Sequence, residues 1–231
     1  MIAITDIHSH VLPGIDDGSQ SVEQSMEMLR YARKQGVTRM VATPHFYAHS
    51  DDPAQFLQRR AQAEAELRQA MADEDLPELI MGAEVYYFPG MSDATELQDL
   101  TIGNTCFLLV EMPTTPWTED MYQELEQIEL KQGLIPILAH IDRYLTRFNQ
   151  YSIFRKLKNL SVLIQANGGF FRNPKTQKWA LRLLSKGKLH LLGSDCHDMD
   201  RRRPELPSAL NQIPQWGLEQ IQSWETEIFR K

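Results

Sequence analysis

Five of the seven histidines of this chain stand in short motifs, and three of these motifs also hold an aspartate. Two glutamates, Glu84 and Glu111, close the apolar runs 79–83 and 106–110. Burying such a charge is costly unless a cation or a hydrogen-bond partner receives it. The pattern predicts a site for several metal ions, with imidazole and carboxylate ligands from His8, His10, His45, Glu84, Glu111, His140, Asp195 and His197.

Such ligands, without any thiolate, suit Mn, Fe or Zn, and the residue types alone do not identify the metal. Divalent ions lower the pKa of a bound water enough for it to act as hydroxide near neutral pH. This hydroxide can attack phosphorus while the ions neutralise the phosphoryl oxygens, so no protein nucleophile is required. The expected chemistry is therefore metal-dependent hydrolysis.

Apolar strand-like runs alternate with amphipathic helical patterns along the chain. Seven strands are expected, ending near residues 5, 42, 83, 110, 139, 166 and 193. Helices are expected to begin at the N-caps Ser21 and Asp52 and near Glu119 and Pro174, and glycines 36, 133 and 187 end three of them. Strands that alternate with helices over the whole length predict a parallel sheet closed into a barrel.

In barrels of this kind the active site lies at the carboxyl ends of the strands, and every proposed ligand falls at such an end. One histidine or glutamate in that position is more often structural. Ligands at the ends of six strands favour the metal site. The remaining strand ends at Asn167-Gly168-Gly169, which offers no ionisable ligand but could hydrogen-bond a substrate or a ligand side chain.

Length and composition narrow the class of protein. The 231 residues fit a single domain, 1–231, with a C-terminal helical tail from about residue 215. A net charge of −7, from 24 basic and 31 acidic residues, argues against nucleic acid as a ligand. We expect a cytoplasmic protein without membrane insertion, because no long apolar run or signal-peptide pattern occurs and the two cysteines fit a reducing compartment.

A larger set of motifs resembles a known family. The motifs are Asp6-Ile7-His8-Ser9-His10, Pro13-Gly14-Ile15-Asp16-Asp17-Gly18, Ala42-Thr43-Pro44-His45, Gly82-Ala83-Glu84, His140-Ile141-Asp142-Arg143, Asn167-Gly168 and Gly193-Ser194-Asp195-Cys196-His197. Their combination resembles the polymerase and histidinol phosphatase (PHP) superfamily and, within it, the bacterial tyrosine-protein phosphatases related to CpsB, CapC and YwqE. Ile141 and Cys196 depart from the usual proline and alanine of that family, and neither stands at a ligand position.

The resemblance implies an α/β fold, a distorted (β/α)7 TIM-like barrel, that holds up to three divalent ions (Mn, Fe, Zn or Mg). It adds Asp17 to the ligands, although the sequence itself does not choose between Asp17 and its neighbour Asp16. It also implies that Arg143 and Arg202 bind phosphate, which a guanidinium matches with two hydrogen bonds. The run of arginines around Arg202 fits a solvated surface equally well.

The implied activity is that of a protein-tyrosine phosphatase acting on a bacterial tyrosine autokinase that controls capsule or exopolysaccharide synthesis. A small-molecule phosphatase of the histidinol-phosphatase type is the nearest alternative. A metal-dependent amidohydrolase fits less well, because its usual bridging lysine has no counterpart, and an inactive barrel that serves as a binding module would be expected to have lost ligands.

Cys196 and Arg202 match the Cys-x5-Arg spacing of cysteine-based tyrosine phosphatases, but the acids around this thiol oppose a thiolate, so a nucleophilic role is not expected.

Six aromatic residues near the strand ends are candidates either for stacking on a phenyl phosphate or for core packing: Phe46, Tyr47, Tyr86, Tyr87, Phe88 and Trp117.

Overall fold

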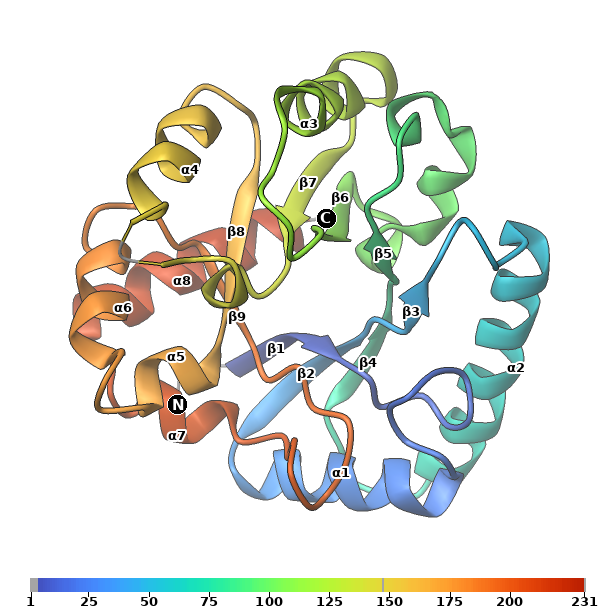
Figure 1. The fold of residues 1–231 in the computed structure, drawn as a ribbon. Helices are drawn as coiled ribbons and strands as arrows, with labels where there is room; N and C mark the ends of the chain where they lie inside the picture. The colour runs from blue at the N-terminus through green and yellow to red at the C-terminus, as the bar shows by residue number, and fades with distance from the viewer. Residues whose placement is uncertain (1–3, 147, 231) are drawn as a thin grey trace.

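The computed structural model describes residues 4–146 and 148–230, in which parallel strands curl into a ring that helices surround (Figure 1). The strands are β1 (Ile4–Ser9), β2 (Val37–Ala42), β3 (His45–Phe46), β4 (Glu78–Met81), β5 (Glu84–Tyr86), β6 (Phe107–Glu111), β7 (Ile135–Leu138), β8 (Leu163–Asn167) and β9 (Leu191–Gly193). The helices are α1 (Val22–Lys34), α2 (Pro53–Met71), α3 (Glu119–Gln132), α4 (Gln150–Leu157), α5 (Gly168–Arg172), α6 (Gln177–Leu184), α7 (Leu206–Leu210) and α8 (Gln215–Ile228). Short 3-10 helices include Ile102–Asn104 and Ile141–Arg143.

The sheet is built in two parts, with orders β1-β2-β4 and β3-β5-β6-β7-β8-β9, and all of its pairings are parallel. The expected strand that ends at Ala42 is present as β2, and a further short strand, β3, follows it after Thr43-Pro44. The expected strand 79–83 is interrupted, because Gly82-Ala83 separates β4 from β5. A single bridge between Ser9 and Cys196 brings the ends of β1 and β9 together. The predicted α/β barrel is confirmed, in a distorted form whose wall is broken rather than continuous.

Capping residues position the helices as the sequence predicts. The side chains of Ser21 and Asp52 accept hydrogen bonds from the backbone N–H groups of Gln24 and Gln55. Gly133 ends α3 with a φ of 67°, a left-handed conformation that glycine adopts without strain. The helix expected to begin near Pro174 is shorter than predicted: α6 covers only Gln177–Leu184.

The interior of the barrel is apolar at the amino ends of the strands. Phe107, Leu163 and Leu191 are the first residues of β6, β8 and β9, and all three are buried in one apolar cluster. Ile228 of α8 belongs to the same cluster, so the C-terminal tail closes this end of the barrel. The opposite end, where the strands have their carboxyl ends, is left open for polar side chains. In the described part of the chain, no helix has both the length and the apolar character needed to cross a membrane.

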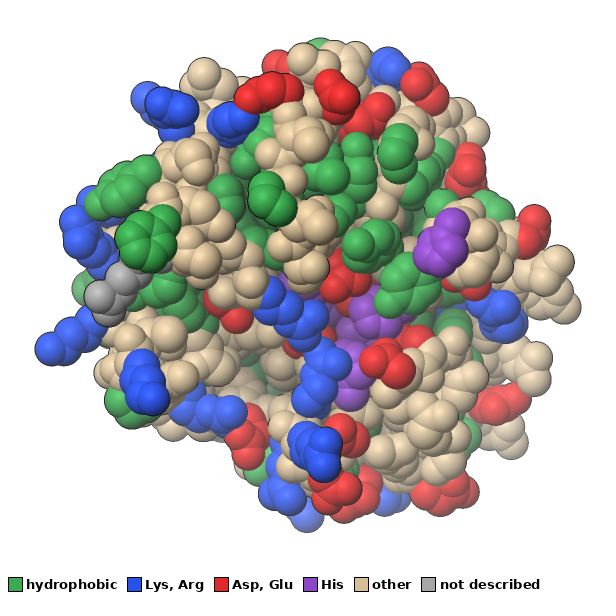
Figure 2. Space-filling view, in the orientation of Figure 1, with side chains coloured by type: hydrophobic (Ala, Val, Ile, Leu, Met, Phe, Trp, Pro, Cys, Tyr) green, Lys and Arg blue, Asp and Glu red, His purple; other side chains and the backbone are tan. Residues whose placement is uncertain are grey.

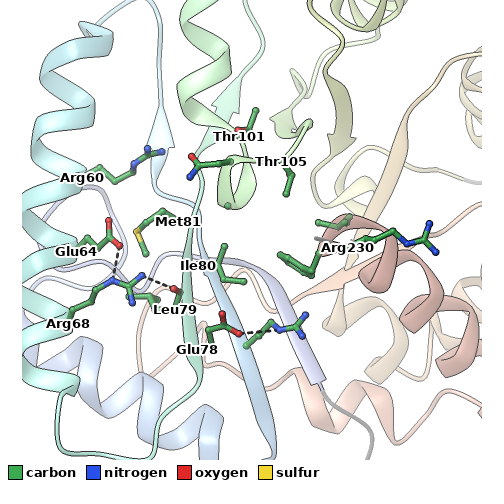
Figure 3. Close-up of a pocket in the computed structure, with 15 residues that line it drawn as sticks. Arg60, Glu64, Arg68, Glu78, Leu79, Ile80, Met81, Thr101, Thr105 and Arg230 are labelled. Atoms are coloured by element: carbon green, nitrogen blue, oxygen red, sulfur yellow. Dashed lines mark hydrogen bonds and ion pairs between the residues drawn. The ribbon is translucent and has the colours of Figure 1, made fainter.

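The gap in the barrel wall beside β4 forms a cavity of about 770 Å³, which is lined by residues of α2, β4 and the end of α8 (Figure 3). Arg68 donates a hydrogen bond to the carbonyl of Leu79, and Arg60 donates one to the carbonyl of Gly82. These arginines therefore satisfy backbone groups at the edge of β4 that no neighbouring strand pairs. The cavity is remote from the proposed ligands, none of which lines it.

Candidate metal centre

The carboxyl ends of the strands bring all nine predicted ligands to one mouth of the barrel, where histidines gather at the centre of Figure 2. His8 lies in β1, His10 just beyond it, His45 in β3, Glu84 at the start of β5 and Glu111 at the end of β6. His140 follows β7, and Asp195 and His197 follow β9. Seven of the nine fall into three overlapping groups whose ligand atoms lie within 4.8 Å of one another: His10, Asp17, His45 and His197; His8, His10 and Glu84; His45, Glu84 and Glu111.

Glu84 lies at the centre of the cluster and is fully buried. Its Oε2 is 3.1 Å from Nε2 of His8, 3.2 Å from Nε2 of His10 and 3.2 Å from Nδ1 of His45. Its Oε1 is 2.8 Å from Nε2 of His140. One carboxylate therefore faces four imidazoles, which is the geometry expected of a ligand shared between ions.

His140 and Asp195, which are outside those three groups, also face the cluster. Nε2 of His140 is 3.5 Å from Oε1 of Glu111, and Oδ1 of Asp195 is 3.5 Å from Nε2 of His10. Both residues have left-handed backbone conformations, with φ of 31° for His140 and 54° for Asp195. Non-glycine residues held this way cost about 1–3 kcal/mol each and persist where the surrounding structure requires them.

Several buried polar atoms of the cluster lack a hydrogen bond. Among the described residues, this is true of Oε2 of Glu84, Nδ1 of His45, Nδ1 of His140 and Nε2 of His197. Buried polar atoms without partners are rare in folded proteins, and an ion is one of the usual reasons for them. The donor set, imidazole nitrogens and carboxylate oxygens, fits divalent transition metals. The residues present therefore fit several metal ions and leave the identity of the metal open.

The charges of the cluster also favour bound cations. Burial alone would raise the pKa of Glu84, but His8, His10 and His140 hold it well below its usual value. Burial would lower the pKa of His10, but the hydrogen bond to Asp16 and the nearby charge of Glu84 raise it to about 10. Burial and the nearby charge of Glu84 raise the pKa of Glu111 to about 7. The carboxylates thus require nearby positive charge, which bound cations can supply in place of imidazole protons.

The structure separates the roles of Asp16 and Asp17. Oδ2 of Asp16 is 2.7 Å from Nδ1 of His10 and accepts the backbone N–H of His45, while its Oδ1 accepts the N–H of Gly18. A Cβ at Gly18 would lie 2.3 Å from the carbonyl oxygen of His10, so only glycine fits this turn. Oδ1 of Asp17 instead lies 3.3 Å from Nε2 of His197. Asp17 faces the imidazole nitrogens directly, and Asp16 orients His10.

Polar residues outside the ligand set hold the ligand loops. Oδ1 of Asp6 accepts the N–H of Ser194, and Oδ1 of Asp142 accepts the N–H of Asn167. The side-chain amide of Asn167 donates to Oδ2 of Asp195, so the strand end without an ionisable ligand does orient one. Gln165, which the sequence analysis missed, accepts the N–H of His140 at 2.6 Å and lies 3.3 Å from Nδ1 of His8. The one feature of the sequence that could have revealed Gln165 is its position as a polar residue inside an apolar strand.

Arg143 and Arg202 flank the cluster at the edge of the mouth. Both guanidinium groups contact Asp195, with Arg202 donating to Oδ1 at 2.5 Å and Arg143 to Oδ2. Their side chains are 37% and 35% exposed, and both line a groove of about 290 Å³ beside the ligands. Oδ1 of Asp198 accepts the N–H groups of residues 200, 201 and 202, which fixes the turn that presents Arg202. Arg202 is therefore turned toward the site rather than left on a solvated surface.

Cys196 is fully buried, and burial together with the charge of Asp6 raises its thiol pKa.

The aromatic candidates divide between mouth and core. Tyr47 stacks on His45 with ring centroids 5.3 Å apart, whereas Phe46 and Tyr87 are buried in the main core. Phe46 packs edge-on against Phe56 of α2, so core packing, one of its two expected roles, is the one that the structure supports.

The chain is similar to several known proteins. The family described as "Capsular polysaccharide synthesis, CpsB/CapC" matches residues 4–223. Tyrosine-protein phosphatase CpsB of Streptococcus agalactiae serotype III (strain NEM316) is 29% identical over 217 residues, covering 88% of this chain and 87% of the relative. Tyrosine-protein phosphatase YwqE of Bacillus subtilis (strain 168) is 28% identical over 212 residues, covering 89% and 82%.

A solved structure matches as well. It comes from work on YwqE of Bacillus subtilis and CpsB of Streptococcus pneumoniae, described as "unique metal-dependent tyrosine phosphatases". The match has a TM-score of 0.83 and 25% identity, and it covers 98% of this chain and 94% of the other. The chain belongs to the CpsB/CapC family of capsular polysaccharide synthesis proteins.

Proposed function

We propose that this protein is a metal-dependent protein-tyrosine phosphatase that hydrolyses phosphotyrosine on a bacterial tyrosine autokinase of capsule or exopolysaccharide synthesis. The observation that carries the proposal is the single cluster in which Glu84 faces four imidazoles, with Arg143 and Arg202 at its edge. Family membership and the names of the relatives support the tyrosine phosphatase activity.

The proposed ligands are His8, His10, Asp17, His45, Glu84, Glu111, His140, Asp195 and His197, for up to three divalent ions. When bound, such ions supply an activated water and neutralise phosphoryl oxygens. Arg143 and Arg202 bind the remaining phosphoryl oxygens through paired N–H donors, and they orient phosphorus toward the cluster. Asp16 and Gln165 keep the imidazoles of His10 and His8 in place.

The substrate is a phosphoryl group on a tyrosine. Tyr47 stacks on the proposed ligand His45 at the mouth, and in this proposal its ring also packs against the phenyl group of the substrate. We further propose that residues 1–231 act as one domain, because the ligands come from nearly its whole length and α8 of the C-terminal tail closes the barrel. A cytoplasmic location fits the free cysteines Cys106 and Cys196.

The test is the release of phosphate from three substrates: a phosphotyrosine peptide, histidinol phosphate and p-nitrophenyl phosphate. The proposal predicts the highest kcat/KM on the phosphotyrosine peptide in the presence of a divalent metal. Preference for histidinol phosphate would instead assign a small-molecule phosphatase. Absence of turnover on all three, in a protein that contains metal, would contradict the proposal and leave an amidohydrolase or a binding module to be tested.

A further inference from the structure

Charge is distributed very unevenly along the chain. Residues 143–194 contain 11 of the 24 lysines and arginines and none of the 31 aspartates and glutamates. This segment therefore carries a formal charge of +11, whereas the other residues, with 13 basic and 31 acidic residues, carry −18. The net charge of −7 does not reveal this strongly basic region. An uneven distribution of charge along the chain is typical of proteins that bind a polyanionic surface.

The fold gathers much of this charge on one outer face, formed by α4, α6 and the residues that follow each helix. We call Arg155, Lys158, Arg182, Lys186 and Lys188 the basic face. The first four are exposed, and among the described residues no carboxylate forms an ion pair with any of the five. Figure 2 shows basic side chains along this edge of the molecule, over α4 and α6, with few acidic ones among them. The described carboxylates therefore do not neutralise the basic face.

Apolar groups stand among these cations. Phe148 and Tyr151, at the start of α4, are 96% and 71% exposed, and Phe148 has the highest exposure among the exposed large apolar side chains. Two hollows of about 290 and 230 Å³ lie between the cations, and both reach the ring of Phe154. Long cationic side chains around exposed rings are typical of proteins that lie at a membrane surface.

We propose that the basic face binds the surface of a bilayer that contains anionic phospholipids. Lysine and arginine are attracted to such a surface, and aromatic rings suit the boundary between headgroups and acyl chains. The cations are spread over two helices and the residues that follow them, and no described carboxylate pairs with them, so they can meet many mobile headgroups without a fixed geometry. The acidic remainder of the chain does not prevent this contact, because charges more than about 8 Å away are screened at physiological salt.

This orientation has a consequence for the metal centre. Figure 1 looks into the mouth of the barrel, and α4 and α6 lie at its edge. With the basic face on a bilayer, the mouth opens along the membrane surface and stays accessible to a polypeptide anchored in the same bilayer. The inference itself concerns lipid binding and does not depend on the proposed hydrolytic activity.

The test is flotation of the full chain with vesicles of phosphatidylcholine, alone or with about 30% phosphatidylglycerol, at about 0.15 M salt. We expect binding to the anionic vesicles only. The paired variant Lys158→Glu with Lys186→Glu should weaken this binding at least about 25-fold, because each cation near the surface contributes roughly fivefold. Phe148→Ser, which leaves the charge unchanged, should weaken it about fivefold or more through the lost ring contact.

The matched control is Lys34→Glu with Arg230→Glu, which makes the same change in charge at exposed positions outside residues 143–194. It should bind anionic vesicles much more tightly than the Lys158 and Lys186 variant does. Three results would overturn the proposal: no binding to anionic vesicles, equal binding to pure phosphatidylcholine, or equal weakening by the control. A fourth is binding to polyglutamate or DNA without vesicle binding, which would assign the basic face to a macromolecular partner.

Discussion

Oε1 of Glu84 lies 2.8 Å from Nε2 of His140, although the two residues are 56 positions apart, with Glu84 at the start of β5 and His140 just after β7. The contact exists only when β5, β6 and β7 pair in register, because these strands place the two side chains at one end of the barrel. The contact between Glu84 and His45 depends on the pairing of β5 with β3, and the contact with His8 depends on how the two parts of the sheet meet. The candidate metal centre is thus a product of barrel closure, and ions bound there would stabilise the folded state.

Replacing Glu84 by glutamine should remove metal binding and activity together. The change keeps the shape of the side chain but removes the charge that faces four imidazoles, so we expect at least about 100-fold lower activity and a lower metal content. Elemental analysis and phosphate release measure the two effects. Glu78→Gln is the control, because Glu78 pairs with Arg39 far from the site and should leave both values unchanged. Full metal content and activity in Glu84→Gln would contradict the assignment of this ligand.

Asp16 and Asp17 should give different results when each is changed to asparagine. Asp17→Asn removes a proposed ligand atom and should reduce the number of ions bound per chain. Asp16→Asn weakens the orientation of His10 and should lower metal affinity about 10- to 100-fold while leaving the number of sites unchanged at saturating metal. Metal titration followed by elemental analysis separates the two outcomes. Reversal of the two results would show that Asp16 is the ligand.

Loss of the Arg143 or Arg202 guanidinium should reduce catalysis and spare metal binding. Hydrogen bonds to charged groups contribute about 1.5–3 kcal/mol, so each alanine variant should lower kcat/KM by about 10- to 150-fold. Arg201→Ala is a suitable control, because Arg201 is exposed and, among the described residues, makes no ion pair. A normal kcat/KM in both variants would remove these arginines from the phosphate site.

Cys196→Ala should keep most of the metal-dependent activity. The thiol is buried and its pKa is raised, so it is unsuited to attack phosphorus despite its spacing from Arg202. Phosphate release by the metal-replete variant measures the effect. If that variant bound metal normally and were inactive, a cysteine-based mechanism would have to replace the one proposed here.

The stability of the fold should decrease with acidity through His190. Nδ1 of His190 accepts the backbone N–H of Ile164, and burial lowers the pKa of the ring to about 4 in the folded state. The unfolded chain, with a histidine pKa of about 6.5, binds the proton more readily, so stability is lost as the pH falls from about 6.5 to 4, by on the order of 2–3 kcal/mol. His190→Asn keeps an acceptor and cannot titrate. Urea unfolding across this range should therefore show a flatter pH dependence for the variant than for the unchanged protein.

Local sequence patterns predict the elements of this fold well. The strand Val37–Ala42 and the helix from Glu119 to its stop at Gly133 follow directly from apolar periodicity and capping residues. The short strand β3 and the break after Met81 were not predicted, because apolar runs do not reveal where a barrel wall breaks. Strand six begins at Leu163 rather than near Leu160, because residues 158–162 leave α4 and turn back toward the sheet before pairing begins.

The candidate site was predictable as far as residue type and strand position allow. Histidines and acids at strand ends indicate the cluster, whereas the division of work between Asp16 and Asp17 depends on the turn at Gly18, which is a matter of three-dimensional geometry. Gln165 contacts the backbone of His140 and the ring of His8, and a lone glutamine within a strand has no spacing pattern that could reveal such contacts.

The central claim is that imidazoles and carboxylates from the strand ends jointly hold several metal ions that the activity requires. The most direct measurement is elemental analysis of the purified protein, combined with phosphotyrosine hydrolysis before chelation, after chelation and after single metals are returned. We predict more than one divalent ion per chain, loss of turnover on chelation and recovery when a suitable metal is returned. A protein that contains no metal and keeps full turnover in the chelator would contradict the account.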